Sequence, residues 1–143
     1  MRMLKALSMR TFKISVLLSV LYLFVVACAS QHSDPNSKGH LEALQTELEL
    51  GVVHKTPAVH TYWIEVKNTG KGPLTIKDVR TSCFCTTVEW DKSPLQPRKT
   101  SKLKVVLDTS EMEPAELFVR EIYIKSDADN PDVNVTMSGS ITN

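Results

Sequence analysis

The stretch Val59-His-Thr-Tyr-Trp-Ile-Glu-Val-Lys-Asn-Thr-Gly-Lys-Gly-Pro73 decides the fold of this chain. Residues 59–67 alternate, so that Tyr62, Ile64 and Val66 share one face and mostly polar side chains share the other. A period of two is the pattern of a strand with one buried face. Residues 68–73 then bring together Asn, Gly and Pro, the residues that tight turns use. The sequence therefore predicts a half-buried strand that ends in a turn.

The same alternation recurs along the chain. In residues 41–50 a helical stripe of leucines competes with a strand, and we favour a strand from Thr46 because Gly51 and the β-branched Val52 and Val53 follow at once. Further runs begin near Leu74, Thr86, Lys102, Phe118 and Val133. About seven strands at intervals of ~8–14 residues predict an all-β fold, an antiparallel β-sandwich.

The N-terminus has the layout of a secretory signal. Residues 1–13 carry four basic residues and no acidic one, and residues 14–27 are apolar apart from two serines and a tyrosine. This run is shorter than the ~20 residues that a membrane-spanning helix needs, which favours a signal peptide. It ends in Phe24-Val-Val-Ala-Cys28, which resembles a bacterial lipobox. Cys28 would then be S-diacylated and become the new N-terminus; the alternative is an ordinary signal peptide or an uncleaved anchor in which Cys28 is an incidental thiol.

These features divide the chain into three parts. Residues 1–27 are predicted to be a lipoprotein signal peptide, and residues 28–43 a lipidated cysteine followed by a flexible tether. The tether is polar, contains Pro35 and Gly39, and has no periodicity. Residues 44–143 are predicted to form the β-sandwich domain.

Charge and motifs argue against several classes of function. Four of the 17 Lys and Arg residues lie before residue 28, so the remaining chain holds 13 basic and 16 acidic residues, a net charge of −3. This solubilising charge includes no clustered basic face, and we expect no nucleic-acid partner. The sequence shows no phosphate loop, zinc motif or Ser-His-Asp set. We predict that the protein is not an enzyme and that it needs no cofactor.

Several short motifs in a fixed order resemble the bacterial "domain of unknown function 1573" family. They are Leu50-Gly-Val-Val, Ile64-Glu-Val-Lys-Asn-Thr-Gly70, Gly72-Pro-Leu-Thr-Ile76, Thr81-Ser-Cys-Phe-Cys-Thr86, Pro94-Leu-Gln-Pro97 and Ile124-Lys-Ser-Asp. The resemblance covers Thr46 to about Ile141. It implies an immunoglobulin-like domain that binds partners without catalysis, in lipoproteins or exported proteins common in Bacteroidetes. This chain departs from the family pattern at Phe84 and Arg98, where the family usually has Gly.

Cys83-Phe84-Cys85 is the one constellation with evident chemistry. In a strand, side chains two residues apart point the same way, so the two sulfurs could reach each other or one metal ion. A bonded pair would be structural or a redox switch. Two thiolates could also hold Cu(I), and His54 or His60 could add a third ligand, although the spacing of these histidines predicts no convergence on the cysteines. All three interpretations remain open at this level. Catalytic thiols normally have a cationic neighbour or a helix N-terminus that activates them, and only Arg80 is near these cysteines in the sequence.

The aromatic residues Phe84 and Trp90 flank this region and could form an exposed recognition patch; the alternative is that they pack in the core, as aromatic residues more often do. We therefore expect a lipid-anchored module of the cell envelope, on the outer membrane, that binds an envelope protein or a glycan. The alternative is an envelope thiol-redox or copper-binding protein that works through Cys83 and Cys85.

Lipidation at Cys28 is directly testable. Metabolic labelling with palmitate should mark the wild-type protein, and Cys28→Ser should abolish the label because the acylated sulfur is gone. Persistence of the label in this variant would rule out the anchor.

Overall fold

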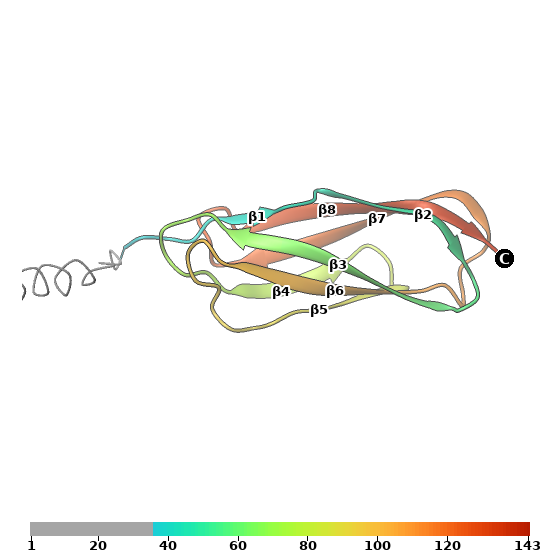
Figure 1. Ribbon diagram of the computed structural model, residues 1–143, viewed down its shortest axis with the longest axis horizontal. Coiled ribbons are helices and arrows are strands. Elements are labelled where there is room, and N and C mark those ends of the chain that lie inside the picture. Colours follow the sequence, from blue (N-terminus) through green and yellow to red (C-terminus); the bar gives the residue numbers. More distant parts are fainter. Residues whose placement is uncertain (1–35) are drawn as a thin grey trace, which may run out of the picture. The chain divides into compact units, whose positions relative to one another are not determined.

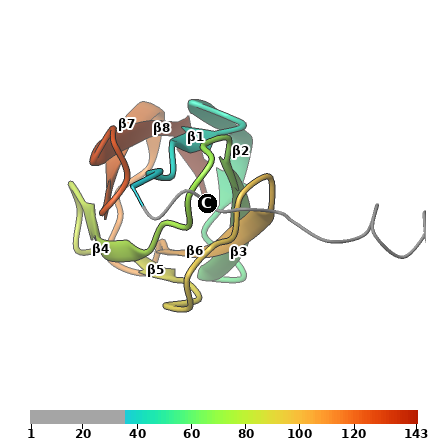
Figure 2. The ribbon, with the colours of Figure 1, turned by 90° about the vertical axis from the view of Figure 1, so that its left-hand side faces the viewer.

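The computed structural model describes residues 36–143, which fold into two four-stranded sheets packed face to face (Figure 1, Figure 2). The predicted signal peptide and Cys28 lie outside the described residues. The strands are β1 (Leu41–Ala43), β2 (Glu47–His54), β3 (Val59–Asn68), β4 (Ile76–Thr81), β5 (Thr86–Glu89), β6 (Thr100–Asp108), β7 (Ala115–Ser126) and β8 (Asp132–Thr142). Within residues 36–143 no helix is long and apolar enough to cross a membrane.

The strand order confirms the β-sandwich and corrects two details. One sheet runs β1-β3-β6-β5 and the other β2-β8-β7-β4. All neighbouring strands are antiparallel except β2 and β8, which are parallel, so the expectation of a purely antiparallel sandwich is wrong for this pair. Residues 36–143 also contain eight strands where about seven were expected. The additional strand is β1, which is too short for its periodicity to be recognised in the sequence.

β1 also moves the start of the domain into the predicted tether. Leu41 is 1% exposed, although residues 28–43 were expected to be flexible. The Asn130 side chain bonds both backbone groups of Leu41, as a neighbouring strand would. Asn130 Oδ1 accepts from the Leu41 amide at 2.9 Å, and Asn130 Nδ2 donates to the Leu41 carbonyl at 2.7 Å. The boundary predicted at residue 44 is therefore too late, and the folded part includes at least Leu41–Ala43.

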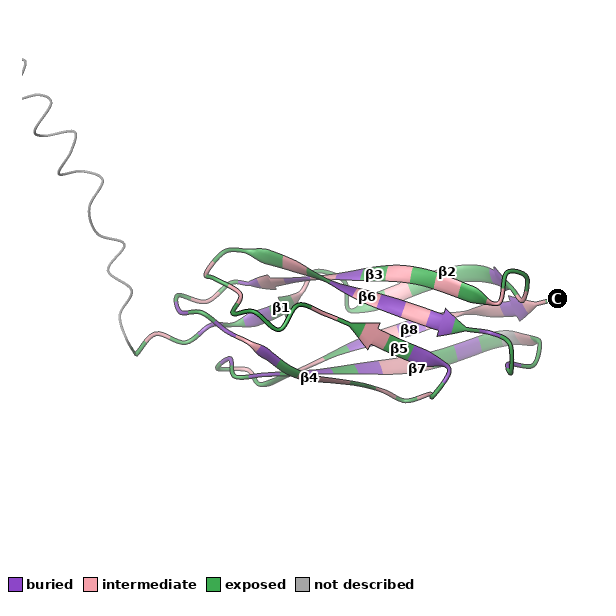
Figure 3. Cartoon of the chain, turned by 90° about the horizontal axis from the view of Figure 1, so that it is seen from below, coloured by how far each residue is buried: buried purple, intermediate pink, exposed green. Residues whose placement is uncertain are grey.

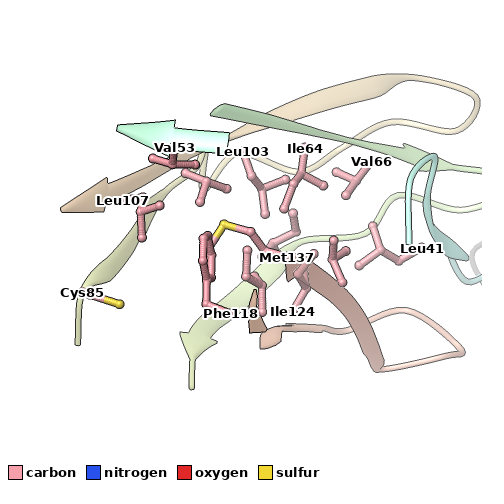
Figure 4. Close-up of a cluster of buried hydrophobic side chains, with 14 of the residues drawn as sticks. Leu41, Val53, Ile64, Val66, Cys85, Leu103, Leu107, Phe118, Ile124 and Met137 are labelled. Carbon is pink, nitrogen blue, oxygen red and sulfur yellow. The ribbon is translucent and has the colours of Figure 1, made fainter. Parts of the chain in front are cut away.

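The core lies between the sheets and follows the alternation of the strands (Figure 3, Figure 4). Ile64 and Val66 of β3 are fully buried, as the pattern predicted. From the facing sheet, Ile122 and Ile124 of β7 meet them together with alternate residues of β8. These apolar side chains supply the main driving force for folding, at about 25 cal/mol per Å² of apolar surface buried.

One end of the sandwich is organised by a buried polar residue, Asn68, at the end of β3. Its Nδ2 donates to the carbonyl oxygens of Gly72 at 2.8 Å and Leu95 at 2.9 Å. Its Oδ1 accepts from the amides of His40 at 3.2 Å and Gly70 at 3.0 Å. Every hydrogen-bonding position of the amide is thus used, which is what a fully buried amide requires.

Replacing Ile64 tests the register of the core. Ile64→Ala should lower the free energy of unfolding by about 2–4 kcal/mol, because it leaves a cavity at a fully buried position. The neighbouring change Glu65→Ala should cost less than ~1 kcal/mol, since Glu65 forms only an exposed ion pair with Lys102. Urea unfolding of the chain from residue 28 onward measures both, and equal small effects would show that the register is wrong.

Asn68→Asp tests the polar end of the sandwich. It keeps the size of the side chain but replaces two donors by a carboxylate that faces two carbonyl oxygens, and should cost at least ~3 kcal/mol at neutral pH. Burial raises the pKa of such a carboxyl group, so this deficit should grow as the pH rises above ~4. The matched control is Asn134→Asp on the exposed side of β8, which should change stability by less than ~1 kcal/mol. A small, pH-independent effect at residue 68 would contradict the role given to Asn68.

Candidate functional site

The Cys83–Cys85 segment is a turn that joins the edge strands of the two sheets. It follows β4 and precedes β5, and the two sulfur atoms are bonded to each other at 2.00 Å. The Thr81 hydroxyl lies 2.9 Å from the carbonyl oxygens of both Cys83 and Thr86, and the Thr86 amide donates to the Cys83 carbonyl at 3.2 Å. The turn is therefore braced at both ends, and the two sulfur atoms reach each other from a turn and not from a strand.

The turn places its middle residue in solvent. Phe84 is 92% exposed, whereas Cys85 is buried and Cys83 is half-buried. Phe84 does not adopt a positive φ, so this turn does not need the glycine that the family usually has between the cysteines. A large side chain can stand at this position without backbone strain.

A hollow of about 420 Å³ lies beside the turn and opens between it and the start of β7. Met112 and Phe118 form part of its lining, and both are buried members of the core. A Cβ atom at Gly139 would lie 3.1 Å from the Phe118 ring, so the glycine on β8 leaves the space that this ring occupies. The hollow therefore opens onto the core of the sandwich, and the Phe118 side chain is seen within that core in Figure 4.

Arg120 stands at the same opening. Its guanidinium lies over the Phe118 ring, 5.8 Å from the ring centroid, and its Nη1 donates to the Val119 carbonyl at 2.8 Å. Its Nε is buried and has no hydrogen-bond partner among the described residues. Buried polar atoms normally find a partner, so this side chain is only partly satisfied in the free domain.

Three apolar side chains surround the opening and face solvent. Phe84 is 92% exposed, Leu117 is 70% exposed and Val119 is 45% exposed, and all three line the hollow. We call these three residues the Phe84 surface. Single exposed apolar residues are common on proteins, but a group gathered around a hollow is characteristic of an interaction site.

The loop before β7 adds negative charge to the rim. Glu111 and Glu113 are exposed and line the hollow on either side of Met112. Hydrogen bonds from the amide and the side chain of Ser110 hold the pKa of Asp108 below its usual range, so this carboxylate stays ionised at neutral pH. The site therefore combines an apolar centre with an acidic border.

A sequence model of the family described as "Protein of unknown function (DUF1573)" matches residues 41–141. The chain belongs to the DUF1573 family. This confirms the resemblance found in the sequence motifs. No curated protein matches the chain significantly.

Solved structures similar to this DUF1573 domain confirm the immunoglobulin-like fold. A protein of unknown function from Porphyromonas gingivalis W83 matches with a TM-score of 0.61 and 21% identity, over 71% of this chain and 46% of that one. The ASH/PapD-like domain 7 of human CEP192 matches with a TM-score of 0.57 and 8% identity, over 80% and 92%. The E. coli chaperone DraB matches with a TM-score of 0.51 and 16% identity, over 72% and 55%. This chain thus spans less than half the length of the P. gingivalis protein, and at these identities the likeness concerns the fold.

The structure separates the two aromatic residues that were expected to form one patch. Phe84 stands at the start of β5, whereas Trp90 follows its other end, is half-buried against the core, and donates from Nε1 to the Ile76 carbonyl at 3.3 Å. Trp90 is therefore a packing residue. Leu117 and Val119 take its place beside Phe84. The sequence did contain a signal for them: three consecutive apolar residues, 117–119, cannot all face the core of a half-buried strand.

The two histidines considered as third metal ligands, His54 and His60, do not join the cysteines. His60 Nε2 lies 2.7 Å from the His54 carbonyl oxygen, so the His60 ring contacts the backbone of His54. Among residues 36–143 no group of three His, Cys, Asp or Glu side chains is close enough to hold a metal ion. Arg80 is paired with Asp78 at 2.7 Å and not with a cysteine.

A second hollow, of about 620 Å³, lies over β4, β7 and β8 and is larger. Its lining includes the paired Asp78 and Arg80 and the half-exposed Tyr123. Asp78 and Arg80 already pair with each other, and among its lining residues only Tyr123 is a large exposed hydrophobic one, against three around the smaller hollow. We therefore place the candidate site at the Phe84 surface.

Proposed function

We propose that this DUF1573 domain is a lipid-anchored, non-catalytic module of the cell envelope that binds a partner protein through the Phe84 surface. The observation that carries the proposal is the exposure of Phe84 on a braced turn. Burying a phenylalanine side chain is worth about 1.5–3 kcal/mol, and free Phe84 gains almost none of this. A partner that covers Phe84, Leu117 and Val119 together gains that free energy on binding.

The position of the Phe84 surface supports this role. The chain reaches the domain next to His40, whose amide donates to Asn68 at the end of β3. The disulfide turn lies at the opposite end, where the Asp108 amide donates to the Cys85 carbonyl and Asp108 pairs with Val59 at the start of β3. Because β3 runs from Val59 to Asn68, the two ends are separated by about 30 Å at ~3.3 Å per residue. A domain tethered through residues 28–35 would carry the surface on its far end.

The N-terminal sequence supports the location. The apolar run that ends at Cys28 is the motivation for a lipid anchor. An aspartate after the lipidated cysteine would retain a lipoprotein at the inner membrane. Ala29 stands at this position, and this supports the outer membrane as the destination.

Thiol exchange is the second candidate, and the bonded cysteine pair favours it. A partner thiolate would attack the half-buried Cys83 sulfur, the Cys83–Cys85 bond would break, and Cys85 would leave as a thiolate. A second partner thiol would then resolve the mixed disulfide, so that the partner is oxidised and this pair is reduced. Catalysts of this reaction lower a thiol pKa with a cation or a helix N-terminus. Arg120 lines the same hollow but donates to the Val119 carbonyl.

A photo-crosslinking amino acid at position 84 tests the proposed function. In envelopes of cells that express the full chain, this variant should give discrete adducts with a partner protein because Phe84 lies at the interface. The matched control carries the same amino acid at Trp63, an exposed aromatic residue of β3, and should give no corresponding adduct. The adducts should persist when Cys83 and Cys85 are both replaced by Ser.

Two outcomes would contradict this function. Equal adduct patterns at positions 84 and 63 would mean that Phe84 marks no specific interface. Rapid reduction of insulin by the reduced domain, lost in Cys83→Ser, would establish the thiol-exchange candidate in its place.

A further inference from the structure

The first part of β7 has no neighbouring strand on the side of β4. The two strands pair from Thr81 with Ile122 to Ile76 with Ser126, and the Ser82 amide adds one bond to the Glu121 carbonyl at 2.9 Å. The chain then turns away toward Cys83. Within residues 36–143 no other strand pairs with Ala115–Arg120 on this side, whereas β8 pairs with them on the other. A strand-sized position in line with β4 is therefore open next to the Phe84 surface.

The backbone of Val119 points into that open position. The Glu121 amide donates to Ser82 Oγ and the Glu121 carbonyl accepts from the Ser82 amide, so both groups of Glu121 face the β4 side. The pairing with β8 is continuous from Val119 to Glu121. Because backbone groups alternate in direction along an antiparallel strand, the amide and carbonyl of Val119 face the same side as those of Glu121.

The outer strands of the two sheets carry features that limit further pairing. β4 carries Lys77, Asp78 and Arg80 and has a register shift between Ile76 and Asp78. β1 and β5 are short, with three and four residues. β2 carries Glu47 and Glu49 and has a bulge between Glu49 and Val52. Short strands, charges and bulges are the usual means of preventing further pairing. The open stretch of β7 presents Leu117 and Val119 to solvent beside the hollow, so it offers an added strand both free backbone groups and apolar contacts.

We propose that Ala115–Arg120 binds an extended peptide segment of the partner protein as an added strand, in line with β4. This inference rests on the proposed function and specifies how the Phe84 surface is used. Alternate side chains of an added strand point to opposite faces. One row would lie beside the exposed Val119, and the other would enter the hollow toward Met112 and Phe118. The segment should therefore carry apolar side chains at alternate positions.

Charge specifies the partner further. Glu111 and Glu113 border the hollow and Asp108 ends β6 beside Cys85, so a segment flanked by Lys or Arg is complementary. A second copy of this chain is a poor occupant, because its own open stretch follows the same acidic loop and would bring like charges together. The partner is thus a basic, apolar extended segment of another protein.

In the free domain the Arg120 side chain makes one of the hydrogen bonds that an added strand would make. Its Nη1 donates to the Val119 carbonyl, which is the bond that an amide of the incoming segment would make. A charged side chain that covers an edge in this way limits unwanted pairing. Binding would exchange this bond for a backbone bond and release the guanidinium.

The test uses the chain from residue 28 onward and a synthetic peptide of seven residues, with Val and Thr alternating between a Lys at each end. The peptide should bind in a fluorescence polarisation assay and should protect the Val119 amide from hydrogen exchange. Val119→Pro removes this outward-facing N–H, and should weaken binding at least tenfold while the melting temperature stays close to that of the wild type. The matched control Val119→Thr keeps the N–H and the β-branched shape and should bind within about threefold. Replacing both Lys by Glu in the peptide should weaken binding.

Three results would overturn strand addition. The first is undiminished binding to a folded Val119→Pro variant. The second is the absence of binding, or protection at another edge such as β2. The third is a concentration-dependent dimer that protects Val119 without peptide, which would make a second copy the occupant. If Phe84 adducts form in cells and persist in Val119→Pro, the proposed function stands and only the mode of binding is wrong.

Discussion

The four hydrogen bonds of the Asn68 side chain are the constraint on which the arrangement of this domain depends. They join the segment around His40, the turn at Gly70 and Gly72, and the connection at Leu95, three parts of the chain that are distant in sequence. The Asn68 carbonyl also accepts from the Arg98 amide at 2.7 Å. A buried polar group is costly unless all its positions are used, so this network permits one arrangement of the end of the sandwich and excludes others.

The two ends of the sandwich differ as a result. At the Asn68 end the backbones approach closely: a Cβ atom at Gly70 or Gly72 would collide with the segment of Ser37 to His40, so only glycine fits there. At the other end, β4 ends at Thr81 opposite Ile122 and leaves the first residues of β7 without a neighbour on that side. The disulfide turn then leads the chain to the other sheet. The polar end is closed by backbone contacts, and the opposite end leaves apolar side chains and a strand edge in solvent. A domain held at its closed end would present its open end to a partner.

Departures from the family pattern have different physical costs. Arg98 adopts φ 65°, a left-handed conformation that favours glycine, which accounts for the glycine usual at this position in the family. Phe84 also replaces a glycine, but its backbone is not left-handed, so the substitution adds an exposed aromatic ring without backbone strain. The first departure costs stability, about 1–2 kcal/mol for a residue other than glycine. The second changes the surface that this chain offers.

The sequence by itself determined seven of the eight strands in residues 36–143, the core face and the family. The reason is that alternation and turn residues are local properties: Ile64 and Val66 are buried where the pattern of residues 59–67 placed them. Only the tertiary structure decided that β2 runs parallel to β8, that Leu41 belongs to the domain, and that Leu117 and Val119 lie beside Phe84 while Trp90 packs on the core. These facts depend on which distant segments meet. The hydrogen bond between Asn130 and Leu41, and the edge left open because β4 ends at Thr81, produce no periodic pattern in the amino-acid sequence that could predict them.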